Sequence, residues 1–317
     1  MATISDYLTQ LQTDKQTLVD NLVAKGVEAT SDETFTSLVP KVLDVSGDVS
    51  EYFETSYSGT SPKYWIRNNY IKKIPDIIID DSVETLEYFA YGATSLPKIV
   101  CNSNVKDMSN MYYNISPTVK NIDVSGLDTS NVTSMKNMFS NNSGLISIDL
   151  SNFDTSKVTT INSLFAFSTN IVSLDLSNFD TSNVEDSGFN RFVYSNSNLE
   201  FLNISSFDFG KATMFGTEIF YNCSKLKDLK FGFNIGKGYI KKTENYSNCS
   251  IKLSSCSNLT HDSLMSVING LYDLNLTYDV ANGGTLYTQQ LTLGSTNLAK
   301  LTEEEIAIAT NKGWTVS

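Results

Sequence analysis

The sequence is poor in the side chains that enzymes most often use for catalysis. Its 317 residues include a single histidine, His261, and four cysteines that form neither a CxxC pair nor a zinc-binding pattern. A glycine-rich phosphate loop and a His-Glu-x-x-His sequence are both absent. We therefore predict that the protein is not an enzyme and that it uses neither a metal ion nor a cofactor.

Positive charge and long apolar runs are also scarce. Lys and Arg number 23 against 35 Asp and Glu, and the formal net charge of −12 argues against nucleic acid and anionic membranes as partners. No stretch is long enough to span a bilayer, so no membrane insertion is expected. The first residues, Met-Ala-Thr-Ile-Ser-Asp, lack the basic and apolar regions of a secretory signal peptide, so we expect synthesis in the cytoplasm without one.

A repeat is the most informative feature that the sequence does contain. Asp-Thr-Ser occurs at 128–130, 154–156 and 180–182, with 26 residues between successive copies. A fixed period of this length is typical of a stacked-repeat solenoid. Such a fold presents a long regular surface, which suits adhesion better than chemistry.

Apolar residues extend the repeat in both directions, in an apolar-x-x-apolar-x-apolar pattern. It fits Ile74/Ile77/Ile79, Leu96/Ile99/Cys101, Val119/Ile122/Val124, Leu145/Ile148/Leu150, Ile171/Leu174/Leu176, Leu199/Leu202/Ile204 and Leu226/Leu229/Phe231. Each copy is expected to form a short strand with its last two apolar side chains pointing inward. The separation of the central positions grows from about 22 to about 28 residues, within the usual range for such repeats.

A second apolar pattern follows most of these strands. Val105/Met108/Met111 and Val132/Met135/Met138 step by three, which suits a helical or 3₁₀ turn packed against the sheet. We therefore predict an α/β solenoid over 74–260: a leucine-rich repeat stack with a parallel β-sheet and short helical turns, capped at both ends.

The cysteines fit the same repeat. Cys223 stands where other copies have Asn142, Ser168 and Asn196, which indicates a ladder of small, half-polar buried side chains and free thiols. Cys249 lies one repeat further on, and a disulfide between neighbouring coils stays conceivable there.

Both ends of the predicted solenoid have the composition of caps. Residues 46–73 are rich in aromatic side chains that would close the first coil, with carbohydrate stacking as the alternative role. In 261–317, Thr260 would cap a helix, Leu291 lies in a predicted strand, and Thr302 with Glu305 forms a capping box before a last helix that Trp314 follows as an apolar plug.

The N-terminal residues 1–45 follow a different pattern. A three-four spacing of apolar residues, with Lys15 at the one polar seam position, resembles a short heptad seam and joins Ile4, Leu8, Leu11, Leu18 and Leu22. One interpretation is a helical pair folded on the solenoid. The other is a helical module for attachment or oligomerisation, which would make the protein a homo-oligomer and join it to a larger assembly.

The candidate binding residues lie between the inward strand positions. Asp123, Asp149 and Asp175 are expected to point outward in register, where like charges should raise one another's pKa or recruit a cation or a hydrogen-bond donor. A structural ladder, a ligand or cation site, and a catalytic pair are the alternatives. The full predicted row is Asp123, Ser147, Asp149, Ser173, Asp175, Asn203 and Lys230. The other aspartates of the repeat, Asp128, Asp154 and Asp180, are expected to form Asx turns.

Segments of this sequence resemble two groups of known proteins. The phrase Leu-Asp-Leu-Ser-Asn-Phe-Asp-Thr-Ser-Asn-Val at 174–184, with Met-x-x-Met-Phe at 135–139 and Asn-Cys-Ser at 222–224, resembles the surface-protein leucine-rich repeats of anaerobic bacteria. Members of that family are usually secreted adhesins with a signal peptide or wall anchor. The segments 18–27 and 301–314 resemble tail and baseplate proteins of phages that infect Gram-positive bacteria.

These resemblances imply a binding protein without catalytic residues. The leading hypothesis is a tail-fibre or baseplate receptor-binding protein of such a phage, or of a phage-tail-like bacteriocin, located in the virion. Its partners would be a host surface protein or glycan and, through the N-terminus, other tail proteins. The alternatives are a bacterial leucine-rich-repeat adhesin, a structural virion decoration protein, and a polysaccharide-degrading spike.

Overall fold

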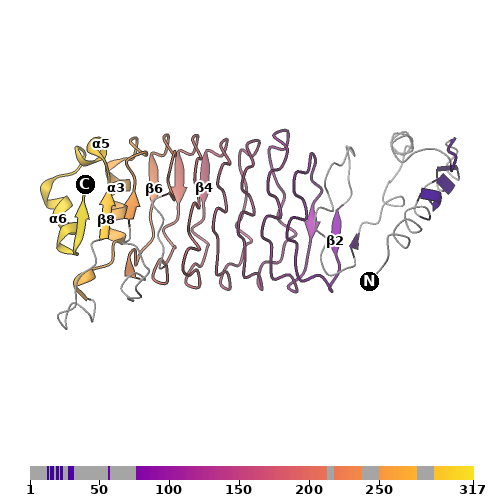
Figure 1. Cartoon of the computed structure of the whole chain (residues 1–317), viewed down its shortest axis with the longest axis horizontal. Helices are drawn as coiled ribbons and strands as arrows, with labels where there is room; N and C mark the ends of the chain where they lie inside the picture. Colours follow the sequence, from indigo (N-terminus) through magenta and orange to yellow (C-terminus); the bar gives the residue numbers. More distant parts are fainter. Residues whose placement is uncertain are drawn as a thin grey trace.

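The computed structural model describes residues 76–212, 218–237, 250–276 and 289–317, the backbone of 56–57, and residues 13, 15–17, 19–20, 22–23 and 28–31. From residue 76 onward the chain runs in successive coils that stack side by side along the long axis (Figure 1). Short parallel strands pair between neighbouring coils. The described part is therefore a β-rich repeat stack.

The described residues include nine strands in three parallel sheets. The first has β1 (Ser56–Tyr57), β2 (Ile77–Ile79) and β3 (Ile99–Val100), the second β4 (Ser173–Asp175), β5 (Phe201–Asn203) and β6 (Asp228–Lys230), and the third β7 (Ser250–Lys252), β8 (Gln289–Thr292) and β9 (Trp314–Val316). Ile77 pairs with Ile99 and Leu174 with Leu202, so the separation grows from 22 to 28 residues as predicted. β1 adds a strand within the segment predicted to be a cap.

The strands predicted around Ile122 and Ile148 do not form. The apolar side chains point inward, with Ile122 5% and Leu150 3% exposed, but the backbone there has no strand pairing. Cys101 instead forms an isolated bridge with Leu127, three residues beyond the Val124 that the apolar pattern aligns with it. This offset interrupts the ladder after β3.

The second apolar pattern forms consecutive β-turns, so the prediction of short helical turns in the coils was wrong. Met138 N–H donates to Met135 O at 3.2 Å, the i→i−3 bond expected of a 3₁₀ turn. Asn137, however, has φ 56°, and a left-handed residue cannot continue a right-handed helix. Its N–H donates instead to Asn162 O of the next coil at 2.9 Å. Within the described residues, α-helices follow the strands only after β7; before it, Lys237 alone is in a 3₁₀ conformation.

The core between the strand and turn faces contains two columns of aromatic rings. In one, Tyr112, Phe139 and Phe165 stack at 5.7 and 5.4 Å between centroids. In the other, Phe153, Phe179 and Phe207 stack at 6.3 and 6.2 Å. Each of these coils adds one ring to each column, so apolar burial continues without a break from coil to coil.

The Asp-Thr-Ser repeat holds neighbouring coils together. The Asp154 carboxylate accepts a hydrogen bond from Ser156 N–H at 3.0 Å, and the same Asx turn at Asp128 and Asp180 confirms that prediction. Thr155 is buried, donates to Asp180 O at 2.9 Å and accepts from Asp180 N–H at 2.8 Å. The threonine thus bonds both the N–H and the C=O of the aspartate that begins the next Asp-Thr-Ser copy.

A group of helices lies at the C-terminal end of the described stack. They are α3 (His261–Gly270), the 3₁₀ helix η3 (Leu274–Leu276), α5 (Ser295–Leu298) and α6 (Glu303–Asn311). Thr260 is the N-cap of α3, and Thr302 with Glu305 forms the capping box of α6, as predicted. Leu291 is buried on β8, and Trp314 is buried on β9 with its Nε1 donating to Tyr272 O at 3.0 Å.

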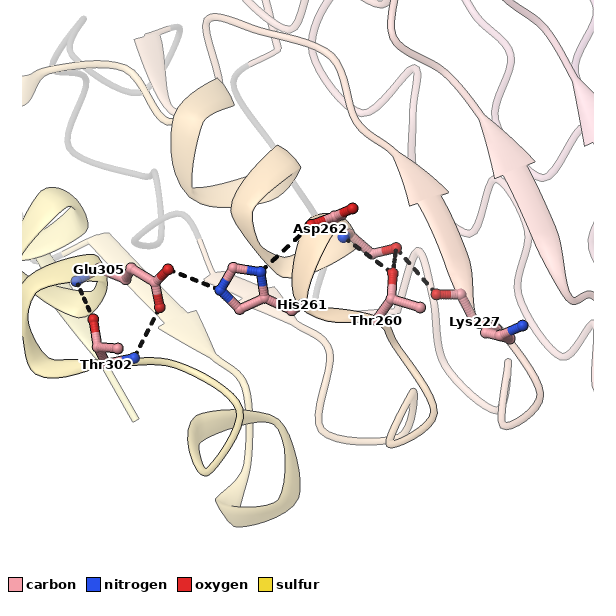
Figure 2. Close-up of polar contacts among 7 residues, drawn as sticks. Lys227, Thr260, His261, Asp262, Thr302 and Glu305 are labelled. Carbon is pink, nitrogen blue, oxygen red and sulfur yellow. Dashed lines mark hydrogen bonds and ion pairs between the residues drawn. The ribbon is translucent and has the colours of Figure 1, made fainter.

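Side chains of helix α3 form hydrogen bonds with the backbone along the outer edge of β6. Leu229 N–H donates to the Ser263 hydroxyl at 2.8 Å, and Phe231 N–H donates to the Ser266 hydroxyl at 2.8 Å. Ser263 also donates to Lys227 O at 3.0 Å (Figure 2). An exposed strand edge invites pairing with another chain, so these serines protect it.

The predicted N-terminal seam is described only in part. Positions 13, 15–17, 19–20 and 22–23 are helical, and Lys15 Nζ donates to Ser31 O at 2.6 Å. Val19 and Leu22 are buried, 5% and 0% exposed. Ile4, Leu8, Leu11, Leu18 and, apart from the β1 backbone, the aromatic segment 46–73 lie outside the described residues. In the part that the structure describes, no helix is long and apolar enough to cross a bilayer.

Candidate functional site

The predicted binding row lies on the outer side of the strands, and most of its members are exposed. The exposed members are Asp123, Ser147, Asp149, Ser173, Asp175 and Lys230. Asp175, Asn203 and Lys230 stand in register on β4, β5 and β6. Asn203 differs from the rest because it is buried, only 6% exposed.

Each aspartate of the row is fixed by a serine two residues later. Asp123 accepts hydrogen bonds from Ser125 N–H at 2.9 Å and from its hydroxyl at 2.7 Å. Asp149 accepts from Ser151 N–H at 3.0 Å, and Asp175 from Ser177 N–H at 3.0 Å.

These bonds set the charge state of the row. Hydrogen bonds from Ser125, Ser151 and Ser177 hold the pKa values of Asp123, Asp149 and Asp175 below the usual range. The prediction that the carboxylates raise one another's pKa was therefore wrong, whereas the prediction that they recruit donors is confirmed. The donors come from each aspartate's own turn.

Asn203 uses its amide to connect two coils. Its Nδ2 donates to Asp175 Oδ1 at 3.0 Å, and its Oδ1 accepts from Ser205 N–H at 3.2 Å and the Ser205 hydroxyl at 2.9 Å. The expectation of a solvent-facing amide was wrong, because these bonds turn the side chain onto the stack. Asn203 thus forms the same turn as the aspartates without their charge.

The row remains able to bind hydrogen-bond donors. Each aspartate uses Oδ1 in its turn, and Oδ2 of Asp123, Asp149 and Asp175 has no hydrogen-bond partner among the described residues. Lys230 lies at the far end and contributes to the lowered pKa of Asp175. The charge therefore changes from acidic to basic along the stack, from one strand to the next. No group of three or more His, Cys, Asp or Glu that could hold a metal ion occurs in the described ranges.

The half-polar ladder forms as predicted and is structural. Asn142 Nδ2 donates to Tyr112 O, the Ser168 hydroxyl to Phe139 O, Asn196 Nδ2 to Phe165 O and Cys223 Sγ to Val193 O, at 2.8, 2.6, 2.9 and 3.0 Å. Cys256 continues it, with Sγ 3.6 Å from Phe220 O. Cys249 lies outside the described residues.

The described cysteines are free thiols in the core. Cys101, Cys223 and Cys256 are all buried and none is in a disulfide. Burial raises the pKa of Cys101 to about 11 and that of Cys256 to about 12. Because the thiolate is the reactive form, these side chains are chemically inert at neutral pH.

The turn face holds a depression that sequence reasoning missed. It encloses about 450 Å³ and lies over the β-turns of consecutive coils. Its floor contains Ser140 and Ala166, at a repeat position where other coils have Tyr113 and Tyr194. The available signal was this loss of bulk in the middle of a tyrosine column, which becomes visible only once the turns are aligned.

The repeated part of the chain is also where the comparisons with known proteins find similarity. Residues 98–202 and 145–252 each match a family model described as "Mycoplasma protein of unknown function, DUF285". No curated protein and no solved structure matches the chain significantly. The matched stretch is thus similar to a repeat family, and the family's description assigns it no function.

Proposed function

We propose that this chain is a non-enzymatic receptor-binding protein of a phage tail, or of a phage-tail-like bacteriocin, directed at Gram-positive bacteria. In this proposal the coils are a leucine-rich-repeat solenoid of the α/β class, capped at both ends. The strand-face row binds a host surface protein or glycan, and the protein is located in the virion.

One observation carries the proposal: a row of short polar side chains is already ordered before any partner binds. The Asx turns at Asp123, Asp149 and Asp175 fix these carboxylates while leaving one oxygen of each available. Ordering a side chain on binding costs conformational entropy, and here that cost is small. The change from Asp123 to Lys230 favours one orientation of an asymmetric partner.

The particle assignment is supported by the two ends of the chain. Segments 18–27 and 301–314 resemble phage tail and baseplate proteins, and Val19 and Leu22 of the first are buried. Residues 1–45 would attach the chain to other tail proteins and to its own copies.

A bacterial surface adhesin is the second candidate. The match of residues 98–252 to a family of Mycoplasma proteins favours it, as does the resemblance of the 174–184 phrase to bacterial surface repeats. An adhesin would use the same row of side chains but would be found on the producing cell.

The two candidates differ in where the protein accumulates. Particles induced from the bacterium that carries the gene would be purified on a density gradient and analysed by mass spectrometry, beside the cell-wall fraction. We expect the chain in the particle fraction and antibody label at the tail tip. Recovery from the cell wall alone would overturn the virion proposal in favour of the adhesin.

The row itself is tested by removing charge while keeping the turn. Asn203 shows that asparagine forms the same turn, so Asp149→Asn with Asp175→Asn should leave the melting temperature unchanged and weaken adsorption to host cells about tenfold. Asp154→Asn with Asp180→Asn changes the same turn type off the row and serves as the matched control. Equal adsorption of both variants would exclude the row as the binding site.

A further inference from the structure

The β-turns expose two columns of side chains along the stack. Alignment follows the bonds between coils, such as Asn110 N–H to Lys136 O and Ser163 N–H to Asn190 O. The first turn column is Tyr88, Asn110, Asn137, Ser163, Arg191 and Glu218. The second turn column is Tyr91, Tyr113, Ser140, Ala166, Tyr194 and Tyr221. The second column thus has two tyrosines at each end and two small residues between them.

The small residues leave a groove between aromatic walls. Tyr113 stacks on Tyr91 at 5.6 Å and 10° at one end, and Phe167 packs on Tyr194 at 5.1 Å at the other. Ser140 and Ala166 form the floor of the 450 Å³ depression. This volume falls within the range of about 300–1,000 Å³ that is typical of small-molecule sites.

Phe167 has a backbone conformation that is unfavourable for a bulky side chain. It has φ 61°, in the left-handed region that a bulky side chain rarely adopts, and it is 46% exposed. The equivalent positions in other coils hold residues that tolerate this conformation better, namely Gly92, Asn114, Asn141, Ser195 and Asn222. An exposed aromatic in a strained conformation at the wall of a groove indicates a role in binding.

The polar groups of the groove carry no net charge once the ion pair of Arg191 is counted. Asn137 Nδ2 donates to Asn110 Oδ1 at 3.0 Å, and the other amide atoms, Asn110 Nδ2 and Asn137 Oδ1, have no hydrogen-bond partner among the described residues. Arg191 is the one charged residue of the lining, and it is paired with Glu218 at 2.5 Å. The groove therefore offers a donor and an acceptor without net charge.

We propose that this groove binds a neutral oligosaccharide. Sugar rings would place their C–H faces against Tyr113 and Phe167, and their hydroxyls against the amides of Asn110 and Asn137. Tyr113 and Tyr194 are three coils apart, about 14 Å at the usual strand spacing, which suits a short oligomer better than a single sugar. This site is separate from the strand-face row and does not depend on whether a phage or a bacterium carries the chain.

The test uses the full-length chain and two variants that the fold already accommodates. Phe167→Asn installs the residue of three equivalent turns and should raise or preserve the melting temperature. Ala166→Tyr fills the groove with the side chain of Tyr113 and Tyr194. Val172→Asn, which removes an exposed apolar side chain from the strand face, is the matched control.

Binding would be measured by calorimetry and saturation-transfer NMR with oligomers of glucose, galactose, mannose and N-acetylglucosamine, one to six units long. Polyglycerol phosphate and a proline-rich peptide represent other ligand classes. We expect a neutral oligomer to bind more tightly than its monomer, with affinity about tenfold lower in both groove variants and unchanged in Val172→Asn. The proposal is overturned if no neutral oligomer binds, if both groove variants bind as the wild type does, or if only the anionic polymer or the peptide binds. Adsorption and particle location are measured separately, so failure here leaves the proposed function untouched.

Discussion

At the scale of single residues, Thr155 shows how the repeat fixes the register of its coils. The side chain is 2% exposed and bonds both the N–H and the C=O of Asp180. Thr129 does the same for Asp154, and Thr181 for Asp208. At the Asp-Thr-Ser turn of each coil, one threonine hydroxyl therefore takes the place of the backbone hydrogen bonds that a continuous strand would form.

Thr155→Val should consequently destabilise the stack although it preserves shape. Valine leaves the N–H and C=O of Asp180 without the partners that they have at the buried Thr155 side chain, and each group left unpaired away from water costs about 1–3 kcal/mol. Thr155→Ser keeps the hydroxyl and should cost less. Urea unfolding followed by far-UV circular dichroism would compare the two, and a Val variant as stable as the Ser variant would contradict the assigned role.

The residue scale also shows what the sequence can predict. The Asx turns at Asp128, Asp154 and Asp180 were predictable because their partners lie two residues away in the chain. The burial of Asn203 was not, because it depends on Asp175 of the preceding coil, 28 residues away. The groove depends on five coils at once, and no local pattern marks it.

At the scale of elements, the contact between α3 and α6 joins two groups that titrate, so we expect it to depend on pH. His261 Nε2 lies 2.8 Å from Glu305 Oε1, while Asp262 Oδ1 is 3.5 Å from Nδ1 (Figure 2). The hydrogen bond that His261 donates to Glu305, with the one to Asp262, raises the pKa of His261. Bonds from Thr302 N–H and His261 lower the pKa of Glu305. Glu305 thus connects its own capping box to the first turn of α3.

The signs of these shifts define a pH window. The raised pKa of His261 gives stability that is complete below its unfolded value, about 6.5, and is lost as pH rises through the folded value. The lowered pKa of Glu305 gives stability that is present above about 4.3 and is lost as pH falls through the folded value. The contact is therefore strongest between these limits.

His261→Gln should remove the upper limit of this window. We expect the wild type to melt at a higher temperature than the variant near pH 5.5, with the difference shrinking above pH 7. Fluorescence of Trp314 in a Trp65→Phe background reports on this end of the chain. Glu305→Gln should lose the same dependence while weakening the capping box at every pH. A constant difference between wild type and His261→Gln from pH 5 to 8.5 would contradict the assignment.

At the scale of elements, the sequence predicted the helix caps correctly but not the backbone conformation of the turns within the coils. Thr260, Thr302 and Glu305 signal helix ends through local chemistry, and the structure has these caps. The Met135–Met138 spacing predicted a helical turn in the coil, yet Asn137 has φ 56° and each turn gives an N–H to its neighbour. A spacing of three apolar residues fits both a 3₁₀ helix and consecutive β-turns. The hydrogen bonds between coils select the β-turns.

At the scale of the whole molecule, each coil contacts mainly its immediate neighbours. The bonds of Thr129, Thr155 and Thr181 each reach one coil forward, and the aromatic columns advance one ring per coil. In such a stack the stability is approximately a sum of coil terms and nearest-neighbour terms. Removal of a whole coil should therefore leave the remaining register intact.

Deletion of residues 148–173 tests this directly, because it joins Ser147 to Leu174 at the same point of the repeated phrase. Thr129 would then bond Asp180, and Phe139 would stack toward Phe192, as their counterparts do now. We expect a folded chain with a smaller denaturant m-value, since less surface is exposed on unfolding.

The deletion also removes Ala166 and Phe167, so oligosaccharide binding should disappear. Deletion of 202–228 joins Phe201 to Leu229 and is the control that should fold equally well and still bind. It removes Glu218, the partner of Arg191, but spares every residue that lines the groove. If both deletions unfold the chain, stability is not a sum over neighbouring coils. If both fold and both bind, the groove is not the sugar site.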